Sequence, residues 1–254
     1  MLSPAGSIPR ETPFSGIDFS GGAIVAVSGG SDSTALLLLT KQHLTRTFPA
    51  ARLVAVTVDH GLRPESATEA RIVGDLCRRH EISHRILCWG DPKPKTGLPA
   101  AARAARHRLL SQAAREEGIG MVLTGHTADD QAETVLMRRA RAATLSEGAR
   151  GLAGMAPATL YDGCIWIVRP LLGTRRTALR DWLETQGTGW CEDPSNDNAT
   201  FERPRVRAAL GVSGEATIQG ALSLGNRAAA DRVDLGQRAA ALIRAHAARS
   251  AAGL

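Results

Sequence analysis

Apolar residues along the chain alternate between short runs rich in β-branched side chains and longer stretches with helical spacing. One run, Leu53–Val58, is apolar at nearly every position and is therefore expected to be buried on both faces. This alternation is typical of βαβ units. It predicts a Rossmann-like α/β fold, in which a parallel sheet carries helices on both faces.

The expected elements follow one another along most of the chain. The expected strands are Ala23–Val27, Leu53–Val58, His84–Leu87, Gly120–Thr124 and Cys164–Val168. The expected helices are Thr34–Leu44, Ser66–Arg79, Ala100–Glu117, Asp129–Arg141 and Arg175–Gln186. After a linker at Gly211–Gly214, an Ala-rich helix is expected over Glu215–Ala248. We therefore expect an N-terminal extension (1–21), a catalytic domain (22–212) and a short helical tail (213–254).

The composition narrows the class of protein. Hydrophobic residues make up 43% of the chain, enough for a full core. No apolar run approaches the roughly 20 residues of a membrane span, and the N-terminus lacks the apolar core of a signal peptide. The four cysteines form no CxxC pair, which argues against a zinc ribbon, an iron–sulfur site or a disulfide framework. A cytoplasmic location is expected.

The net charge of +6 makes a polyanionic partner plausible. Because nearly all the basic residues are arginines in an Ala-rich background, a biased genome composition explains the charge equally well. For Arg180 and Arg205 individually, a solvated helix face is the favoured interpretation. As clusters, the arginines favour RNA: Arg138, Arg139, Arg141 and Arg150; Arg175, Arg176 and Arg180; Arg203, Arg205 and Arg207.

A serine- and glycine-rich segment, Ser28-Gly29-Gly30-Ser31-Asp32-Ser33, separates the first expected strand from the first expected helix. Two glycines allow a tight bend that brings backbone N–H groups close to an anion. The following helix adds its own N–H groups and the positive end of its dipole. Ligands bind at this edge of open α/β sheets. The segment is therefore predicted to bind the phosphates of a nucleotide.

Asp32 distinguishes this loop from the commonest phosphate-binding motifs. The lysine of a Walker A loop is missing, and the glycine spacing is not that of GxGxxG. A carboxylate among phosphate donors repels phosphate unless a cation intervenes, so Asp32 is expected to hold Mg²⁺. The simpler alternative is that Asp32 only complements the dipole of the helix that it begins.

A histidine and three acids, His126, Asp129, Asp130 and Glu133, occur at the start of another expected helix. All except Asp129 are expected to share one helix face, directed towards the carboxyl edge of the sheet. The alternative is that the acids only complement the helix dipole. For Asp129 both interpretations stay open.

Six blocks of sequence, in order between about Ala23 and Leu210, resemble the PP-loop ATPases and, more closely, the tRNA(Ile)-lysidine synthetase family. This ordered series is far more specific than any one block. The blocks are SGGSDS from Ser28, VDHGLR from Val58, AARAARH from Ala101, GHTADDQAET from Gly125, RPLL from Arg169 and WCEDPSN from Trp190. A further similarity is to the family's FxRNxxR, through Phe201, Arg203 and Arg207.

Four features depart from the family's pattern. His107 stands where tyrosine is usual, Thr127 replaces the second histidine of a pair, and Pro204 replaces an asparagine. The family's Gly-Ser-Gly after the acidic helix is replaced by the segment Ala142–Glu147. Members of the family often carry C-terminal domains that grip tRNA. Here these domains are expected to be absent or reduced to the helical tail.

The resemblance implies a ligase that uses ATP and Mg²⁺ and releases AMP and diphosphate. Such an enzyme adenylates the wobble cytidine of an isoleucine tRNA with a CAU anticodon, and free L-lysine then displaces AMP at C2. Because the lysine amine has a pKa near 10.4, a carboxylate base must deprotonate it. Asp130 or Glu133 is expected to be that base, and the choice stays open. The oligomeric state is also open, with a homodimer as one option.

The resemblance also assigns roles to individual residues. The catalytic residues are expected to be Asp32, His126, Asp130, Glu133 and Arg169, with Asp32 also binding the metal. The ATP-binding residues are expected to be Ser28, Gly29, Gly30, Ser31, Asp32, Ser33, Asp59, His60 and Gly125. The contacts to tRNA or lysine are expected from Arg63, Arg103, Arg106, Asp129, Arg203 and Arg207.

Other functions remain open at this point. A tRNA thiolation enzyme of the same superfamily would also adenylate a base carbonyl, although those with iron–sulfur chemistry carry CxxC pairs. An amide-forming relative fits the VDHGLR and DDQxET blocks poorly. A third interpretation is a non-catalytic nucleotide-binding protein that has lost its C-terminal domains and binds a partner through the Ala-rich tail. The presence of Asp32, Asp130, Glu133 and Arg169 argues against such a loss of catalysis.

Overall fold

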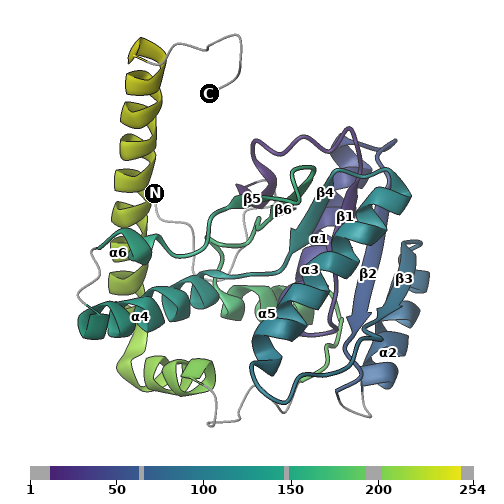
Figure 1. The fold of residues 1–254 in the computed structure, drawn as a ribbon. Helices are drawn as coiled ribbons and strands as arrows, with labels where there is room; N and C mark the ends of the chain where they lie inside the picture. Colours follow the sequence, from purple (N-terminus) through teal and green to yellow (C-terminus); the bar gives the residue numbers. More distant parts are fainter. Residues whose placement is uncertain (1–11, 63–65, 146–148, 193–201, 247–254) are drawn as a thin grey trace. The chain divides into compact units, whose positions relative to one another are not determined.

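The computed structural model describes residues 12–62, 66–145, 149–192 and 202–246 (Figure 1). Contacts divide the chain into two compact units that interleave along the sequence. The first unit is Met1–Ala128 with Pro157–Ser195, and the second is Asp129–Ala156 with Asn196–Leu254. The expected boundary at residue 213 stays a prediction.

The first unit is built on a six-stranded sheet with the order β3-β2-β1-β4-β6-β5. All neighbouring strands are parallel except β5, which pairs antiparallel with β6. The strands are β1 (Ala23–Ala26), β2 (Leu53–Asp59), β3 (Ser83–Cys88), β4 (Met121–Thr124), β5 (Ala158–Tyr161) and β6 (Ile165–Val168). The predicted α/β class with a largely parallel sheet is confirmed.

Helices cover both faces of this sheet, as predicted. Alternate residues of β1 point to opposite faces, so that Val25 belongs to one apolar core and Ile24 to the other. The core with Val25 is packed by α1 (Ser31–Thr47), α2 (Ser66–Arg79) and α5 (Arg176–Thr185). The core with Ile24 is packed by α3 (Leu98–Glu117). The central strand β1 is thus buried on both sides, and its carboxyl end is held rigidly.

Part of the expected N-terminal extension belongs to the first core. A short 3₁₀ helix, η1 (Thr12–Phe14), precedes β1, and Phe14 and Phe19 are both buried. Phe14 stacks on His43 of α1 with ring centroids 4.9 Å apart. Residues 12–21 therefore brace α1 from outside the sheet.

Two local predictions need correction. Helix α1 begins at Ser31 rather than Thr34, so Asp32 and Ser33 lie within its first turn. Strand β5 was not predicted because it is short, lies at the sheet edge and is largely exposed. The Asp162-Gly163 pair, which has positive φ at both residues and joins β5 to β6, is a recognised hairpin signal.

The second unit consists of α4 (Ala128–Leu145), the 3₁₀ helix η2 (Ala149–Ala153) and α6 (Glu202–His246). Ala132 and Val135 of α4 pack against Leu210 and Ile218 of α6 in a small apolar core. The predicted linker at Gly211–Gly214 is wrong in most of its length. Helical structure runs through it, and only Gly214, with φ 76° and ψ −179°, departs from helical backbone.

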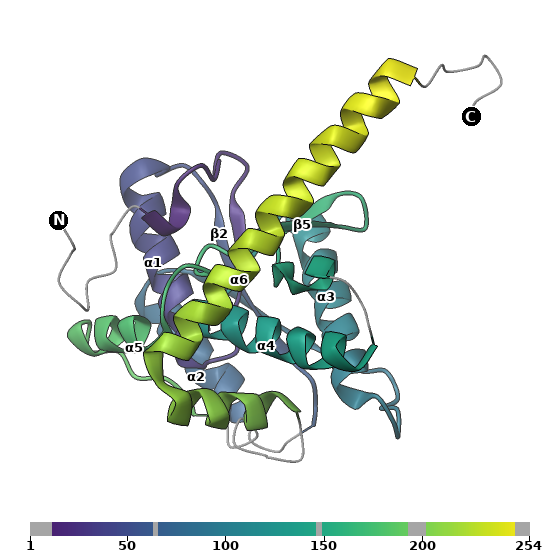
Figure 2. The same ribbon diagram turned by 90° about the vertical axis from the view of Figure 1, so that its left-hand side faces the viewer.

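The last part of α6 extends beyond α4 and η2 in both views (Figures 1 and 2). Its apolar residues are exposed, with Leu242 and Ile243 each at 63%. Within the described residues, no helix combines the length and hydrophobicity of a membrane span. The predicted helical tail is therefore present, and a kink at Gly214 separates it from the helical segment that precedes it.

Candidate functional site

The loop between β1 and α1 has the geometry of a phosphate site. Gly29 has φ +89°, which a side chain would disfavour, and Gly30 is the N-cap of α1. The Ser33 hydroxyl donates to the Gly30 carbonyl at 3.1 Å and accepts from the Ser28 amide at 3.1 Å. These two bonds close the loop around Ser33. The N-terminus of α1 follows directly, and its N–H groups and dipole favour an anion beside the loop.

Neighbouring segments approach this loop closely on two sides. A Cβ on Gly125, just after β4, would lie 3.0 Å from the backbone of both Asp32 and Ser33. A Cβ on Gly29 would lie 3.4 Å from the Cys191 sulfur, and the Cys191 amide donates to the Gly29 carbonyl at 2.9 Å. Gly125, predicted as an ATP-binding residue, is thus required at least for the position of α1.

Asp32 lies at this loop with an arginine that the sequence did not connect to it. Arg176, the first residue of α5, donates from Nε to Asp32 Oδ2 at 2.9 Å. One turn later, Arg180 reaches Ser31 Oγ at 3.4 Å and Glu192 Oε1 at 3.1 Å. The Arg180 side chain stays 40% exposed, as expected for a solvated helix face, although it also contacts Ser31 of the phosphate loop.

The residues at the end of β2 form a second group in the first unit. The Asp59 carboxylate accepts from the Gly61 amide at 2.8 Å. His60 lies edge-on to Trp89 at 5.8 Å, and its Nδ1 is buried without a hydrogen-bond partner. Burial, with the charge of Arg106 as a second cause, lowers the pKa of His60, so the ring is neutral near pH 7.

A cluster of positive charge surrounds His107 in the same unit. Burial, followed by the charges of Arg103, Arg106 and Arg169, lowers the pKa of His107 to about 4. Burial and Arg103 also lower the pKa of Arg169, which is 7% exposed and donates to Thr159 at 3.1 Å. This concentration of cations suits an anionic ligand, and it includes three predicted site residues.

His126 lies in the turn before α4, not on the helix as expected. Its Nδ1 is 3.0 Å from the Thr124 hydroxyl, which fixes the ring. Thr127, the departure from the family's histidine pair, is fully buried. His126 is therefore oriented by the end of β4 rather than by a helix face shared with the acids.

The acidic residues of the second unit are held by arginines of α6. Glu133, 1% exposed, accepts from Arg203 Nε at 2.6 Å and from Arg207 Nε at 2.8 Å. Arg203 also donates to Asp130 Oδ1 at 2.9 Å. The two acids and two arginines form one network of opposite charges. Pro204 fits within it because proline is tolerated in the first turn of a helix.

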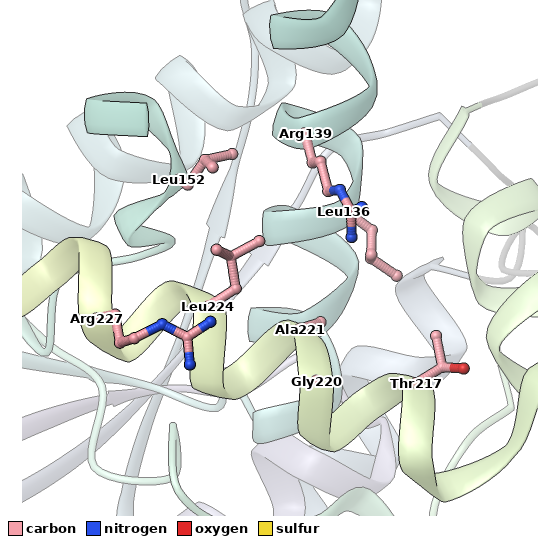
Figure 3. Close-up of a pocket in the computed structure, with 8 residues that line it drawn as sticks. All are labelled: Leu136, Arg139, Leu152, Thr217, Gly220, Ala221, Leu224 and Arg227. Carbon is pink, nitrogen blue, oxygen red and sulfur yellow. The ribbon is translucent and has the colours of Figure 1, made fainter. Parts of the chain in front are cut away.

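The second unit also contains a hollow of about 490 Å³ (Figure 3). Its lining combines apolar side chains with two arginines from three elements of this unit. The lining residues are Leu136, Arg139, Leu152, Thr217, Gly220, Ala221, Leu224 and Arg227. None of the predicted site residues is among them.

The predicted site residues thus fall into separate groups. The first unit contains the phosphate loop together with Asp59, His60, Arg103, Arg106, Gly125, His126 and Arg169. The second unit contains Asp129, Asp130, Glu133, Arg203 and Arg207. Arg63 and Phe201 lie outside the described residues. Arg176 and Arg180 were missed as loop residues, although their spacing of four on one helix placed them on a common face.

These features define a nucleotide-binding α/β protein whose phosphate site lies at the N-terminus of the helix that follows β1. A family model described as the PP-loop domain matches residues 17–213, and the chain belongs to that family. Loop composition and fold agree with this membership.

Proteins of known function are similar over most of the chain. A relative named tRNA(Ile)-lysidine synthase from Mesorhizobium japonicum is 61% identical over 95% of this chain and 53% of its own length. A protein of the same name from Brucella ovis is 54% identical over 82% of this chain and 45% of its own length. The chain therefore spans about half the length of these curated relatives, and the predicted resemblance is confirmed.

A solved structure shares the fold. The U34-tRNA thiolase NcsA from Methanococcus maripaludis, with its [4Fe-4S] cluster, superposes with a TM-score of 0.70 at 17% identity. The match covers 85% of this chain and 74% of that one. At this identity the similarity concerns the fold alone.

Replacing Gly125 by alanine is expected to weaken nucleotide binding about tenfold or more, because the new methyl group would push the first turn of α1 off the end of β4. A titration with a fluorescent ATP analogue measures the effect. Gly120→Ala is the matched control, since its Cβ would meet nothing within 4 Å. Equal affinities for both variants would contradict this role of Gly125.

Replacing Glu133 by glutamine is expected to lower the free energy of unfolding by about 2 kcal/mol, because two arginines lose their buried countercharge. Urea denaturation measures this change. Glu202→Gln is the control, since Glu202 pairs with Arg141 at an exposed position where about 0.5 kcal/mol is expected. A Glu133 variant as stable as the control would show that the network is not structural.

His107 is expected to make the fold less stable as the pH falls. Its folded pKa of about 4 lies below the unfolded value near 6.5, so between these values the unfolded chain binds more protons. The contribution of neutral His107 to the free energy of unfolding is therefore fully present above about pH 6.5 and is lost as the pH falls towards 4. Urea midpoints at pH 7 and pH 5 should differ less in His107→Gln than in the wild type, with the exposed His246→Gln as control. An unchanged difference would oppose this account.

Proposed function

We propose that this chain carries the catalytic part of a tRNA(Ile)-lysidine synthetase, a ligase that forms a carbon–nitrogen bond. In this reaction ATP adenylates the C2 carbonyl oxygen of a wobble cytidine with release of diphosphate. Free L-lysine then displaces AMP at C2. The RNA is an isoleucine tRNA with a CAU anticodon, which reads AUA after modification.

The observation that carries this proposal is the phosphate loop with Asp32 in the first turn of α1, in a chain 61% identical to a relative bearing that enzyme's name. The loop offers hydroxyl and backbone donors but no lysine for a γ-phosphate. Such a loop suits a nucleotide from which diphosphate leaves as a unit. The full activity is proposed for this chain although it spans about half of its relatives.

Mg²⁺ fits the residues at this loop. Asp32 supplies one carboxylate, and Mg²⁺ commonly takes its other ligands from substrate phosphates and water. Within the described chain, no three His, Cys, Asp or Glu side chains cluster as a metal cage. Asp32 would therefore share the ion with the nucleotide, and the ion would neutralise phosphate charge as diphosphate leaves.

The basic cluster of the first unit suits the transfer of the adenylyl group. Arg169 is almost buried, and a buried cation interacts strongly with charge on a phosphate. We propose that Arg169 stabilises the α-phosphate during transfer and that Arg103 and Arg106 bind phosphate of the nucleotide or the RNA. His60, at the end of β2, is proposed to contact the nucleotide as well.

The second step needs a base and a cation site for lysine. A lysine amine with pKa near 10.4 is almost entirely protonated at pH 7 and attacks only after losing its proton. Asp130 and Glu133 are the acids proposed for this step. Because Arg203 and Arg207 neutralise them in the structure, substrate must first rearrange this network to free a carboxylate. Asp129 remains a proposed lysine contact.

Partners and location follow from the substrates. We propose tRNA and free lysine as partners and the cytoplasm as the location, where both are present. A tRNA thiolation enzyme is the second candidate, because such an enzyme would also adenylate a base carbonyl. The chain has no CxxC pair, which weighs against thiolation through an iron–sulfur cluster.

The proposal predicts that the full chain, incubated with ATP, labelled lysine and an isoleucine tRNA with a CAU anticodon, places lysine in the digested nucleosides. The product should vanish in Asp32→Ala, which removes the metal ligand, and persist in Arg78→Gln, which removes an exposed charge on α2. A tRNA with uridine at the wobble position is the substrate control. A product that depends on a sulfur donor and not on lysine would favour thiolation.

A further inference from the structure

The carboxylate proposed to hold Mg²⁺ already has a cationic neighbour. Arg176 Nε lies 2.9 Å from Asp32 Oδ2, and each of the two side chains is 18% exposed. The other oxygen, Oδ1, accepts from the Ser31 hydroxyl at 3.2 Å. A guanidinium and a carboxylate that share so little water interact more strongly than a pair on the open surface.

The position of Arg176 is fixed by the helix that carries it. Leu179 and Leu183 of α5 are fully buried in the core that also holds α1. Arg180, one turn after Arg176, contacts Ser31 and Glu192. Because α5 is tied to this core and to the loop itself, Arg176 reaches Asp32 without a large adjustment of the backbone.

Arg176 and a divalent cation cannot both interact fully with this carboxylate. A divalent ion on Asp32 would lie within a few ångströms of the Arg176 charge, and like charges at such distances repel. Conversely, a triphosphate without metal would meet the negative Asp32, whose charge Arg176 compensates. The same guanidinium therefore opposes metal binding and favours binding of a metal-free nucleotide.

We propose that Arg176 and Mg²⁺ exchange at Asp32. Arg176 is a positioning residue that holds Asp32 until the metal–nucleotide complex binds, then releases the carboxylate to the ion and turns to the phosphates. The exchange makes Mg²⁺ and nucleotide arrive together, since the phosphates give Arg176 a new partner. This inference rests on the proposed nucleotide binding at the loop but not on the identity of the RNA.

The test is a titration of the full chain with a fluorescent ATP analogue at increasing Mg²⁺ and, separately, in EDTA. In Arg176→Gln the Mg²⁺ concentration for half-saturation should fall about fivefold, because the guanidinium that competes with the ion for Asp32 is removed. Affinity in EDTA should fall by a similar factor, because Asp32 then repels the phosphates. A purely structural role of Arg176 would change both affinities in the same direction.

Arg78→Gln is the matched control, because it removes one arginine charge from an exposed pair with Asp75 in the same unit. Asp32→Asn provides a second test through a double-mutant cycle. In that background, Arg176→Gln should leave the Mg²⁺ dependence unchanged. An Arg176→Gln protein that titrates like Arg78→Gln, or an equal effect in the Asp32→Asn background, would overturn the inference.

Thermal unfolding identifies variants that fail to fold. If Arg176→Gln does not fold, Arg176→Lys decides the matter. Lysine keeps the charge but lacks the planar donor set, so the Mg²⁺ requirement should fall by about twofold, and an unchanged requirement would overturn the inference. A wild-type chain that binds no nucleotide at any Mg²⁺ concentration would instead refute the proposed function.

Discussion

The most restrictive contact in the candidate site is the approach of the first turn of α1 to the end of β4. A single added carbon at Gly125 would lie 3.0 Å from the backbone of Asp32 and Ser33. This approach is possible because β1 is buried on both faces and α1 packs along the sheet. It directs the helix N-terminus at the space beyond the strand ends, where open α/β sheets bind their ligands.

Paired charges are a second principle of organisation, and they operate within each unit. Asp32 is held by Arg176 in the first unit, while Asp130 and Glu133 are held by Arg203 and Arg207 in the second. A buried carboxylate without such a partner would be costly. In the proposed mechanism, the same ion pairs also keep each acid from acting until a substrate offers the arginines another anion. Stability and the readiness of the acids for chemistry are thus coupled.

The sequence predicted what depends on local patterns. The βαβ order, the phosphate loop and most element boundaries follow from hydrophobic spacing and glycine chemistry, which act over a few residues. The partners of the acids could not be predicted, because Asp32 and Arg176 are 144 residues apart and Glu133 and Arg203 are 70 apart. Strand β5 was missed although its Asp162-Gly163 turn was readable, because exposed edge strands lack the apolar pattern.

The central claim is that the loop presents the α-phosphate of ATP to an RNA oxygen. The most direct test incubates the chain with an isoleucine tRNA and ATP labelled at either the α- or the γ-phosphate, without lysine, followed by acid quenching. If the loop presents the α-phosphate, α-label is retained on the RNA and γ-label is released as diphosphate. Label appearing as ADP and orthophosphate, with none on the RNA, would contradict it.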